Sequence, residues 1–186
     1  MTITIPTVLT LFRIALLPVM AVVFYLPFRG ANIAAALVFI AAAVTDWADG
    51  WIARRYNMGS AFGAFLDPVA DKLMVAVTLF LLVQSNPTPL LAITSAVIVG
   101  REISISALRE WMAEIGQRAT VRVAMIGKIK TTMQMFAIVV LLYQHDLEEL
   151  RLYRVGESLL VIAAILTIWS GLAYVRAAWP ILRRQD

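Results

Sequence analysis

Long apolar stretches recur along this chain of 186 residues, and they constrain its fold more than any other feature. A helix needs about 20 mostly apolar residues to cross the hydrocarbon core of a bilayer. Six stretches approach that length, over residues 6–25, 30–45, 63–83, 90–112, 123–143 and 158–175. Turn-forming residues separate several of them, as in Asn57-Met58-Gly59-Ser60. The pattern predicts an all-α integral membrane bundle of six transmembrane helices.

The composition excludes a water-soluble domain. Hydrophobic residues make up 61% of the chain and charged residues 15%, whereas soluble domains have about 45–50% and about 25%. A chain with so few polar residues lacks the side chains to cover a surface that faces water. No composition shift or linker divides the sequence, so we expect a single membrane domain over residues 1–186.

The distribution of basic residues predicts how the bundle is oriented. In a soluble protein the net charge of +4 would suggest nucleic acid, but in a membrane protein Lys and Arg gather at the cytoplasmic ends of helices. With the loop after the second stretch in the cytoplasm, that side receives Arg54, Arg55, Arg109, Arg118, Arg122, Lys128, Lys130, Arg176, Arg183 and Arg184. The other side has only Arg29, Arg151 and Arg154. We therefore expect both termini in the cytoplasm and no nucleic-acid partner.

Four aspartates stand where two neighbouring apolar stretches end and begin. Asp46 and Asp49 are three residues apart, and Asp67 and Asp71 are four apart, so each pair shares one face of its helix. Two antiparallel helices would therefore present four carboxylates to one another. Such a cluster repels itself unless cations are bound, and oxygen ligands suit Mg²⁺ or Mn²⁺. We predict a metal site; the alternative, that these aspartates only cap helix ends, is disfavoured because intramembrane acids are costly and usually functional.

The aspartates belong to a longer spaced motif, D-x-x-D-G-x-x-A-R, then eight residues, then G-x-x-x-D-x-x-x-D. Its members are Asp46, Asp49, Gly50, Ala53, Arg54, Gly63, Asp67 and Asp71. Eight residue types at fixed spacing are a specific signal, and this one resembles the signature of the CDP-alcohol phosphatidyltransferases. Residues 5–13, 101–111 and 127–132 extend the resemblance, which covers nearly the whole chain and favours members that use sn-glycerol 3-phosphate. In one departure, Thr7 stands where many relatives carry Asn.

The resemblance implies a reaction in which CDP-diacylglycerol and sn-glycerol 3-phosphate give phosphatidylglycerophosphate and CMP. It implies two divalent metal ions, one held by Asp46, Asp49 and Asp67 and the other by Asp46, Asp67 and Asp71. It also implies that Asp71 acts as the catalytic base towards the acceptor hydroxyl. A homodimer among membrane lipids is implied as well, in the cell (inner) membrane with the active site near the cytoplasmic face.

The same resemblance implies residues that hold the CDP moiety. Gly50, Arg54 and Ser60 match such positions, and Thr10 lies in the matching stretch near the N-terminus. The chemistry agrees with these residue types, because an arginine can form a forked pair of hydrogen bonds to phosphate. A glycine leaves room for a bulky ligand to approach the backbone.

The phosphate of the acceptor requires further cations, and four basic residues are candidates. Arg101 lies halfway along the fourth stretch, and helical spacing places Glu102 and Arg109 on one face of it. The alternative is an ion pair of Glu102 with Arg101 or Arg109 that only holds helices together. Lys128 and Lys130 are two residues apart and point to roughly opposite sides of a helix, so we expect only one of them to reach the phosphate.

Two other functions are compatible with the carboxylates. The first is a related enzyme with a different acceptor, such as inositol phosphate or serine, because the spaced motif does not report on the acceptor. The second is a divalent-cation transporter that uses the aspartates as a transit site. The transporter is disfavoured because the four acids gather at one face of the membrane and no charged path continues to the other.

Overall fold

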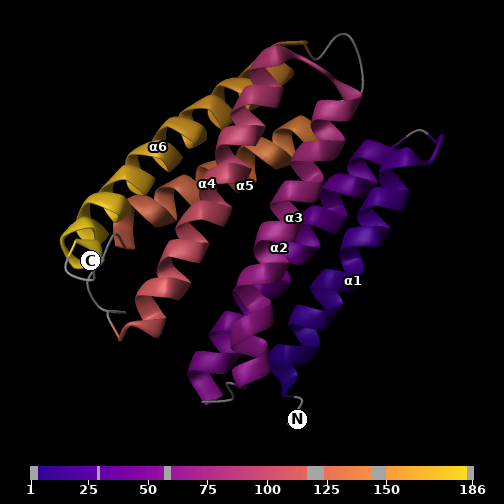
Figure 1. Ribbon diagram of the computed structural model, residues 1–186. Coiled ribbons are helices and arrows are strands. Elements are labelled where there is room, and N and C mark those ends of the chain that lie inside the picture. The colour runs from indigo at the N-terminus through magenta and orange to yellow at the C-terminus, as the bar shows by residue number, and fades with distance from the viewer. Residues whose placement is uncertain (1–3, 29, 57–59, 117–123, 144–149, 184–186) are drawn as a thin grey trace.

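The computed structural model of the chain describes residues 4–28, 30–56, 60–116, 124–143 and 150–183, and these form helices and short connections without a strand. The six helices are α1 (Ile5–Tyr25), α2 (Ala31–Tyr56), α3 (Ala61–Ser85), α4 (Pro89–Glu114), α5 (Ala124–Tyr143) and α6 (Leu150–Leu182). Successive helices run in opposite directions, so α1 begins and α6 ends at the same end of the bundle, the lower end in Figure 1. An all-α bundle is therefore confirmed, whereas the side of the membrane on which this end lies stays a prediction.

Four helices are long and apolar enough to cross a membrane: α1, α2, α4 and the segment Leu152–Ile181 of α6. Their outward surfaces agree with a lipid environment, because the large apolar side chains of Trp47 and Trp169 are each 67% exposed. The chain is thus a multi-pass membrane protein by the length and composition of these helices. For α3 and α5 the predicted membrane crossing stays a prediction; the apolar helical segment Ile129–Tyr143 of α5 is shorter than the other four.

Several helices are longer than the apolar stretches that predict them. The second stretch ends near residue 45, but α2 continues through Arg54 and Arg55 to Tyr56. The sixth stretch covers residues 158–175, whereas α6 covers Leu150–Leu182. Apolarity marks the part of a helix that fits the hydrocarbon layer, while backbone hydrogen bonds continue the helix into polar residues at both ends. As a result the aspartates of the motif lie on regular helix rather than on a loop.

Side-chain caps determine where α3 and α4 begin. Ser60 precedes α3, and its hydroxyl accepts a hydrogen bond from the backbone N–H of Gly63 at 3.0 Å. Thr88 caps α4 in the same way, accepting from the N–H of Leu91 at 3.1 Å, and Pro89 occupies the first helical position. These contacts satisfy backbone donors that a helix start leaves free.

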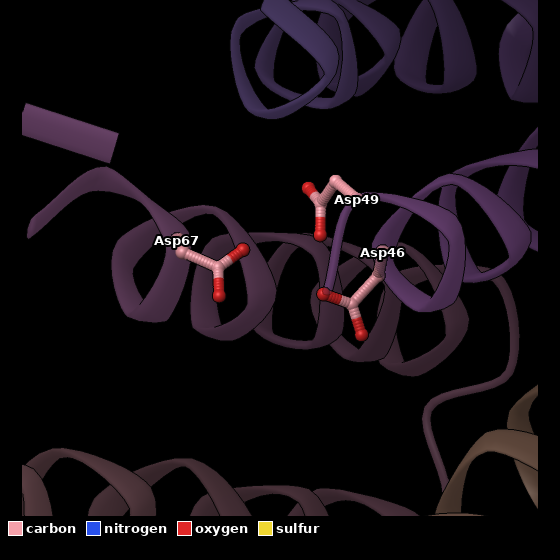
Figure 2. Close-up of side chains that lie close together, drawn as sticks. All are labelled: Asp46, Asp49 and Asp67. Atoms are coloured by element: carbon pink, nitrogen blue, oxygen red, sulfur yellow. The ribbon is translucent and has the colours of Figure 1, made fainter. Parts of the chain in front are cut away.

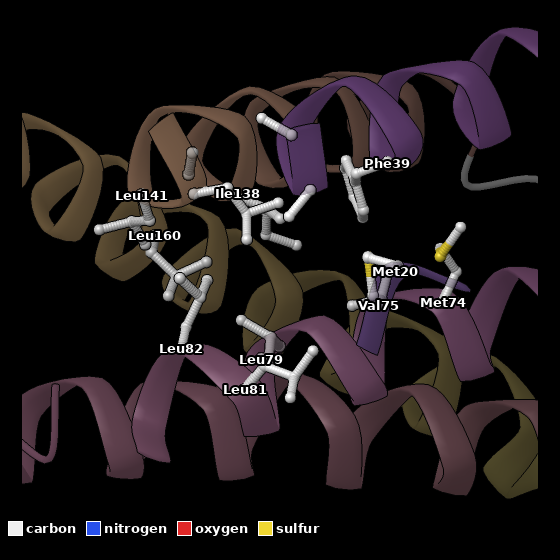
Figure 3. Packing of buried hydrophobic residues seen from close by; sticks show 14 of the residues in the cluster. Met20, Phe39, Met74, Val75, Leu79, Leu81, Leu82, Ile138, Leu141 and Leu160 are labelled. Carbon is white, nitrogen blue, oxygen red and sulfur yellow. The ribbon is translucent and has the colours of Figure 1, made fainter. Parts of the chain in front are cut away.

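A cluster of buried apolar side chains joins all six helices. Figure 3 shows much of this cluster, in which Leu79, Leu81 and Leu82 of α3 line one side and lie opposite residues of α2, α5 and α6. Members with 1% exposure or less, one from each helix, are Met20, Phe39, Leu79, Ile98, Ile138 and Leu160. Helix α3 packs against α1, α4 and α5. This central position of α3 places its aspartates between α1 and α2 on one side and α4 on the other.

Candidate active site

The two aspartate pairs of the motif converge at one end of the bundle. Asp46 and Asp49 project from α2 towards Asp67 on α3, as Figure 2 shows. Each of these three residues offers a carboxylate oxygen, and the three atoms lie within 4.8 Å of one another. The side chain of Asp49 is 5% exposed, whereas those of Asp46, Asp67 and Asp71 are 37–44% exposed. The two helices therefore present carboxylates to one another, as the spacing predicts.

A buried arginine from α1 contacts all four carboxylates. The side chain of Arg13 is 2% exposed, and its Nη1 lies 2.9 Å from Asp46 Oδ1, 3.1 Å from Asp67 Oδ1 and 2.5 Å from Asp71 Oδ1. Its Nη2 donates to Asp49 Oδ2 at 2.6 Å. Three helices thus meet at one guanidinium: Nη1 donates to Asp67 and Asp71, Nη2 donates to Asp49, and Asp46 forms an ion pair with Nη1.

The sequence alone does not single out Arg13, which stands there only as a member of the matching N-terminal stretch, residues 5–13. A signal was present: Arg13 is the single charged residue in an apolar stretch of 20 residues, at positions 6–25. A charge at that depth is costly unless it is paired, so it implied an acidic partner on another helix.

The donor set fits divalent cations of the Mg²⁺ type. These ions prefer carboxylate oxygens, and four carboxylates from two helices gather here. One guanidinium balances only one of the four negative charges, so the cluster keeps an excess of negative charge with Arg13 in place. That excess, together with the grouping of oxygens from Asp46, Asp49 and Asp67, is what a cation site needs.

A small cavity of about 140 Å³ adjoins the carboxylates, between α1, α2 and α3. Its lining includes Pro6, Thr7, Thr10, Asp49, Gly50, Ala53, Ser60, Gly63, Ala64 and Asp67. The hydroxyl of Thr10 donates to the carbonyl of Pro6 at 3.0 Å and lies 3.4 Å from Asp49 Oδ2. Three of the residues predicted to hold CDP, Thr10, Gly50 and Ser60, therefore share one cavity with two of the aspartates.

Two glycines line this cavity. A Cβ atom added to Gly63 would lie 3.0 Å from the hydroxyl oxygens of both Ser60 and Thr7. A Cβ added to Gly50 would lie 3.3 Å from Nη1 of Arg54, the fourth residue predicted to hold CDP. Arg54 is exposed, and its guanidinium lies against the glycine that lines the cavity.

A larger cavity of about 460 Å³ lies on the other side of α3, between α3, α4 and α6. Two basic residues line it: Arg109, which the sequence analysis singled out, and Lys72, which it did not. Lys72 directly follows Asp71 and donates a hydrogen bond to the hydroxyl of Ser106 on α4. Ala64 lines both this cavity and the smaller one, so the two adjoin at the start of α3.

The remaining basic candidates make contacts between helices. Arg101 on α4 donates from Nε to the carbonyl of Thr167, at 3.1 Å, and from Nη2 to Ser170 Oγ, at 2.7 Å, both on α6. Lys130 on α5 is 3% exposed and donates to Glu102, whose Oε1 also lies 3.5 Å from Nη1 of Arg101. These contacts join α4 to α5 and α6, but the ion pair between helices is that of Glu102 with Lys130 and not with Arg101 or Arg109 as in the predicted alternative. A role of Arg101 or Lys130 towards the acceptor phosphate stays a prediction.

Some predicted positions lie outside what the structure describes. Lys128 belongs to α5, but its side chain is among those not described, so its role stays a prediction. The same holds for part of the charge pattern that predicts the orientation, namely Arg29, Arg118, Arg122, Arg151 and Arg184.

Comparison with known proteins assigns the family. The sequence model of the CDP-alcohol phosphatidyltransferase family matches residues 3–169. A protein of Pectobacterium atrosepticum is 52% identical over 174 residues, and one of Salmonella choleraesuis is 50% identical over 174 residues; each alignment covers 94% of both chains. A protein of Shigella flexneri is 51% identical over 174 residues, and that alignment also covers 94% of both chains. All three are named CDP-diacylglycerol–glycerol-3-phosphate 3-phosphatidyltransferase. The chain belongs to the CDP-alcohol phosphatidyltransferase family.

Proposed function

We propose that this protein transfers the phosphatidyl group of CDP-diacylglycerol to sn-glycerol 3-phosphate, which gives phosphatidylglycerophosphate and CMP. The observation that carries the proposal is the convergence of the four aspartates of the family motif around Arg13, beside a cavity lined by the glycines of the motif. The choice of the two substrates rests on relatives that are about half identical over 94% of the chain and are named for this pair.

The carboxylates are proposed to hold two divalent ions, Mg²⁺ or Mn²⁺. Asp46, Asp49 and Asp67 would hold one ion, and the distances of at most 4.8 Å between their oxygens support this set. Asp46, Asp67 and Asp71 would hold the other, and the contacts that all three make with Nη1 of Arg13 support this second set. Bound ions of this kind neutralise the charge that develops on phosphate oxygens during displacement.

Asp71 is proposed to take the proton of the acceptor alcohol. The hydroxyl oxygen attacks the phosphorus that bears the diacylglycerol, and a new P–O bond forms. The bond from that phosphorus to the bridging oxygen breaks, so CMP leaves with the bonding electrons, and the hydroxyl proton passes to the Asp71 carboxylate. The side chain of Asp71 is 43% exposed, which supports access by an alcohol.

The two cavities support separate places for the two substrates. The small cavity, with Thr10, Gly50 and Ser60, would receive the CDP moiety next to Arg54. Its volume of about 140 Å³ is too small for a whole nucleotide, so we expect the cytidine to extend beyond it. The larger cavity would receive sn-glycerol 3-phosphate, because its lining has two basic residues, Lys72 and Arg109, against one acidic residue, Glu110, and so offers net positive charge to a phosphate.

We also propose that the carboxylate end of the bundle lies at the cytoplasmic face of the cell (inner) membrane, in a homodimer of single-domain chains. Arg54 and Arg55 in the last turn of α2 support this orientation, since basic residues favour the cytoplasmic side. The active site would then meet its water-soluble acceptor and release CMP into the cytoplasm, while the diacylglycerol chains stay among membrane lipids.

An acceptor panel on the purified protein in detergent tests the proposal. CMP release from CDP-diacylglycerol is measured with Mg²⁺ or Mn²⁺ and with sn-glycerol 3-phosphate, inositol phosphate or serine, for wild type and for Asp71→Asn. We expect metal-dependent release with sn-glycerol 3-phosphate only, and its loss in the variant. Release with another acceptor would overturn the substrate. No release with any alcohol, together with Mn²⁺ flux in proteoliposomes, would replace the enzyme by a cation transporter.

A further inference from the structure

The two terminal nitrogens of Arg13 contact different members of the four carboxylates. Nη1 contacts Asp46, Asp67 and Asp71, the three residues of the second proposed metal set, at 2.5–3.1 Å. Nη2 contacts only Asp49, the residue that belongs to the first set alone. One nitrogen therefore lies among oxygens from two helices, in the place that a shared cation would need.

The environment of Arg13 makes these carboxylates its counter-charges. The side chain is 2% exposed, and its remaining nitrogen, Nε, has no hydrogen-bond partner among the described residues. A buried guanidinium is costly without anionic partners, and clustered carboxylates are costly without a cation. The guanidinium and the carboxylates thus stabilise each other. The same contacts hold α1 against α2 and α3.

We propose that Arg13 is the built-in counter-cation of this cluster and that its guanidinium competes with the second divalent ion, the one shared by Asp46, Asp67 and Asp71. The inference rests on the proposed function, because it uses the two metal sets assigned there. An ion and Nη1 cannot occupy the space among the same three oxygens at once. Binding of the second ion therefore requires Nη1 to leave these oxygens, and the two ions bind with unequal affinity.

Competition predicts the opposite result from a purely structural role. If Arg13 only supports the fold, removing it loosens the carboxylates and weakens metal binding. If Arg13 competes, removing it leaves the cluster with more negative charge and no rival, so the second ion binds more tightly. The metal-free protein then loses stability while the metal-bound protein loses little, because a ligand that binds only the folded state stabilises it.

The test is a Mn²⁺ titration of the full-length protein in detergent, after treatment with a chelator, with free Mn²⁺ measured by electron paramagnetic resonance. For wild type we expect two binding steps with the second weaker. Arg13→Gln should lower the dissociation constant of the second step by about tenfold, since coupling between ligands of one site is typically of this size. Arg154→Gln is the control: it also removes one positive charge, at an exposed position near the beginning of α6, and both steps should stay as in wild type.

Thermal unfolding of the same proteins gives a readout that does not depend on activity. Arg13→Gln should unfold at a lower temperature than wild type in chelator, and saturating Mn²⁺ should remove most of that difference. A second step that is unchanged or weaker in Arg13→Gln would overturn the inference. If Arg13→Gln does not fold, Arg13→Lys is the test variant. Its single ammonium contacts fewer oxygens than the guanidinium, so the second Mn²⁺ should bind more tightly than in wild type. Unchanged or weaker binding of the second Mn²⁺ would overturn the inference.

Failure of this inference is distinguishable from failure of the proposed function. Wild type that releases CMP and binds two ions, with a second step insensitive to Arg13, would overturn only the competition. Wild type that binds no more than one Mn²⁺ would overturn the competition and the assignment of two metal sets together.

Discussion

The hydroxyl oxygens of Thr7 on α1 and Ser60 at the start of α3 lie 2.7 Å apart. This contact joins two segments that are 53 residues apart in sequence, and Ser60 also caps α3 through the N–H of Gly63. Both hydroxyls line the small cavity beside the aspartates. The capping of α3 and the shape of the proposed CDP site thus depend on the same few atoms.

Gly63→Ala should impair the use of CDP-diacylglycerol. The new Cβ would lie 3.0 Å from both hydroxyl oxygens, so the side chains of Thr7 and Ser60 must shift by a few tenths of an ångström in the wall of the cavity. We expect kcat/KM for CDP-diacylglycerol to fall by about tenfold or more, because small displacements in an active site are costly to the rate. Gly100→Ala is the control, since no atom lies within 4 Å of its new Cβ. Wild-type kinetics in Gly63→Ala would contradict the assignment of this cavity.

Loss of single aspartates should separate the two proposed metal sets. Asp46→Asn and Asp67→Asn each change a ligand of both ions, whereas Asp49→Asn changes a ligand of one. We expect the first two variants to bind no Mn²⁺ at concentrations that saturate wild type, and Asp49→Asn to bind one ion. Rates of CMP release should fall by about 10²–10³-fold, as when other charge-stabilising groups are removed. Two bound ions in Asp49→Asn would contradict the assignment.

The ion pair of Lys130 and Glu102 allows its structural and substrate roles to be separated. Lys130→Met alone leaves Glu102 with only its longer contact to Arg101, at 3.5 Å, and should cost about 1–3 kcal/mol of stability, because Glu102 loses the hydrogen bond from the ammonium. Lys130→Met with Glu102→Gln should recover most of the unfolding temperature. If Lys130 also contacts the acceptor, KM for sn-glycerol 3-phosphate stays raised in the double variant. A double variant less stable than Lys130→Met would contradict the pairing.

Lys72 and Arg109 should determine the affinity for the acceptor. Both line the larger cavity, and removing either charge weakens the attraction for a phosphate. We expect Lys72→Gln and Arg109→Gln each to raise KM for sn-glycerol 3-phosphate by about tenfold, the loss of a charge-assisted contact, and to change KM for CDP-diacylglycerol much less. Arg154→Gln, an exposed position near the beginning of α6, should behave as wild type. Equal changes in both KM values would contradict the assignment.

Close packing of α5 on α6 depends on Gly156. A Cβ added there would lie 2.9 Å from Cγ of Leu141 and 3.1 Å from Cγ1 of Val140. Gly156→Ala should therefore lower the unfolding temperature, with a cost of about 1–3 kcal/mol, as overpacking usually has. Gly100→Ala, which adds the same methyl group in open space, should not lower it. An unfolding temperature of Gly156→Ala equal to that of wild type would show that these helices adjust without cost.

Much of the site was predictable because its aspartates are close together in the sequence. Asp46 and Asp49 share one face of α2, and Asp67 and Asp71 share one face of α3. Helical periodicity alone predicts both pairs. The short connection between the two helices makes them antiparallel, and both pack against α1, so the carboxylates meet beside that helix. The boundaries of α2 and α6 were less predictable, because hydropathy marks the membrane-embedded part of a helix and not its hydrogen-bonded ends.

Hydropathy and residue spacing predict the apolar helices, the two pairs of aspartates and the family motif. They do not predict that Arg13 contacts all four carboxylates, that Arg101 reaches α6 or that Lys130 pairs with Glu102, and these contacts appear only in the folded bundle. The physical reason is that spacing along one helix determines which side chains share a face. The rotation and depth of that helix against its neighbours come instead from packing between residues distant in sequence, such as Met20, Leu79 and Ile138.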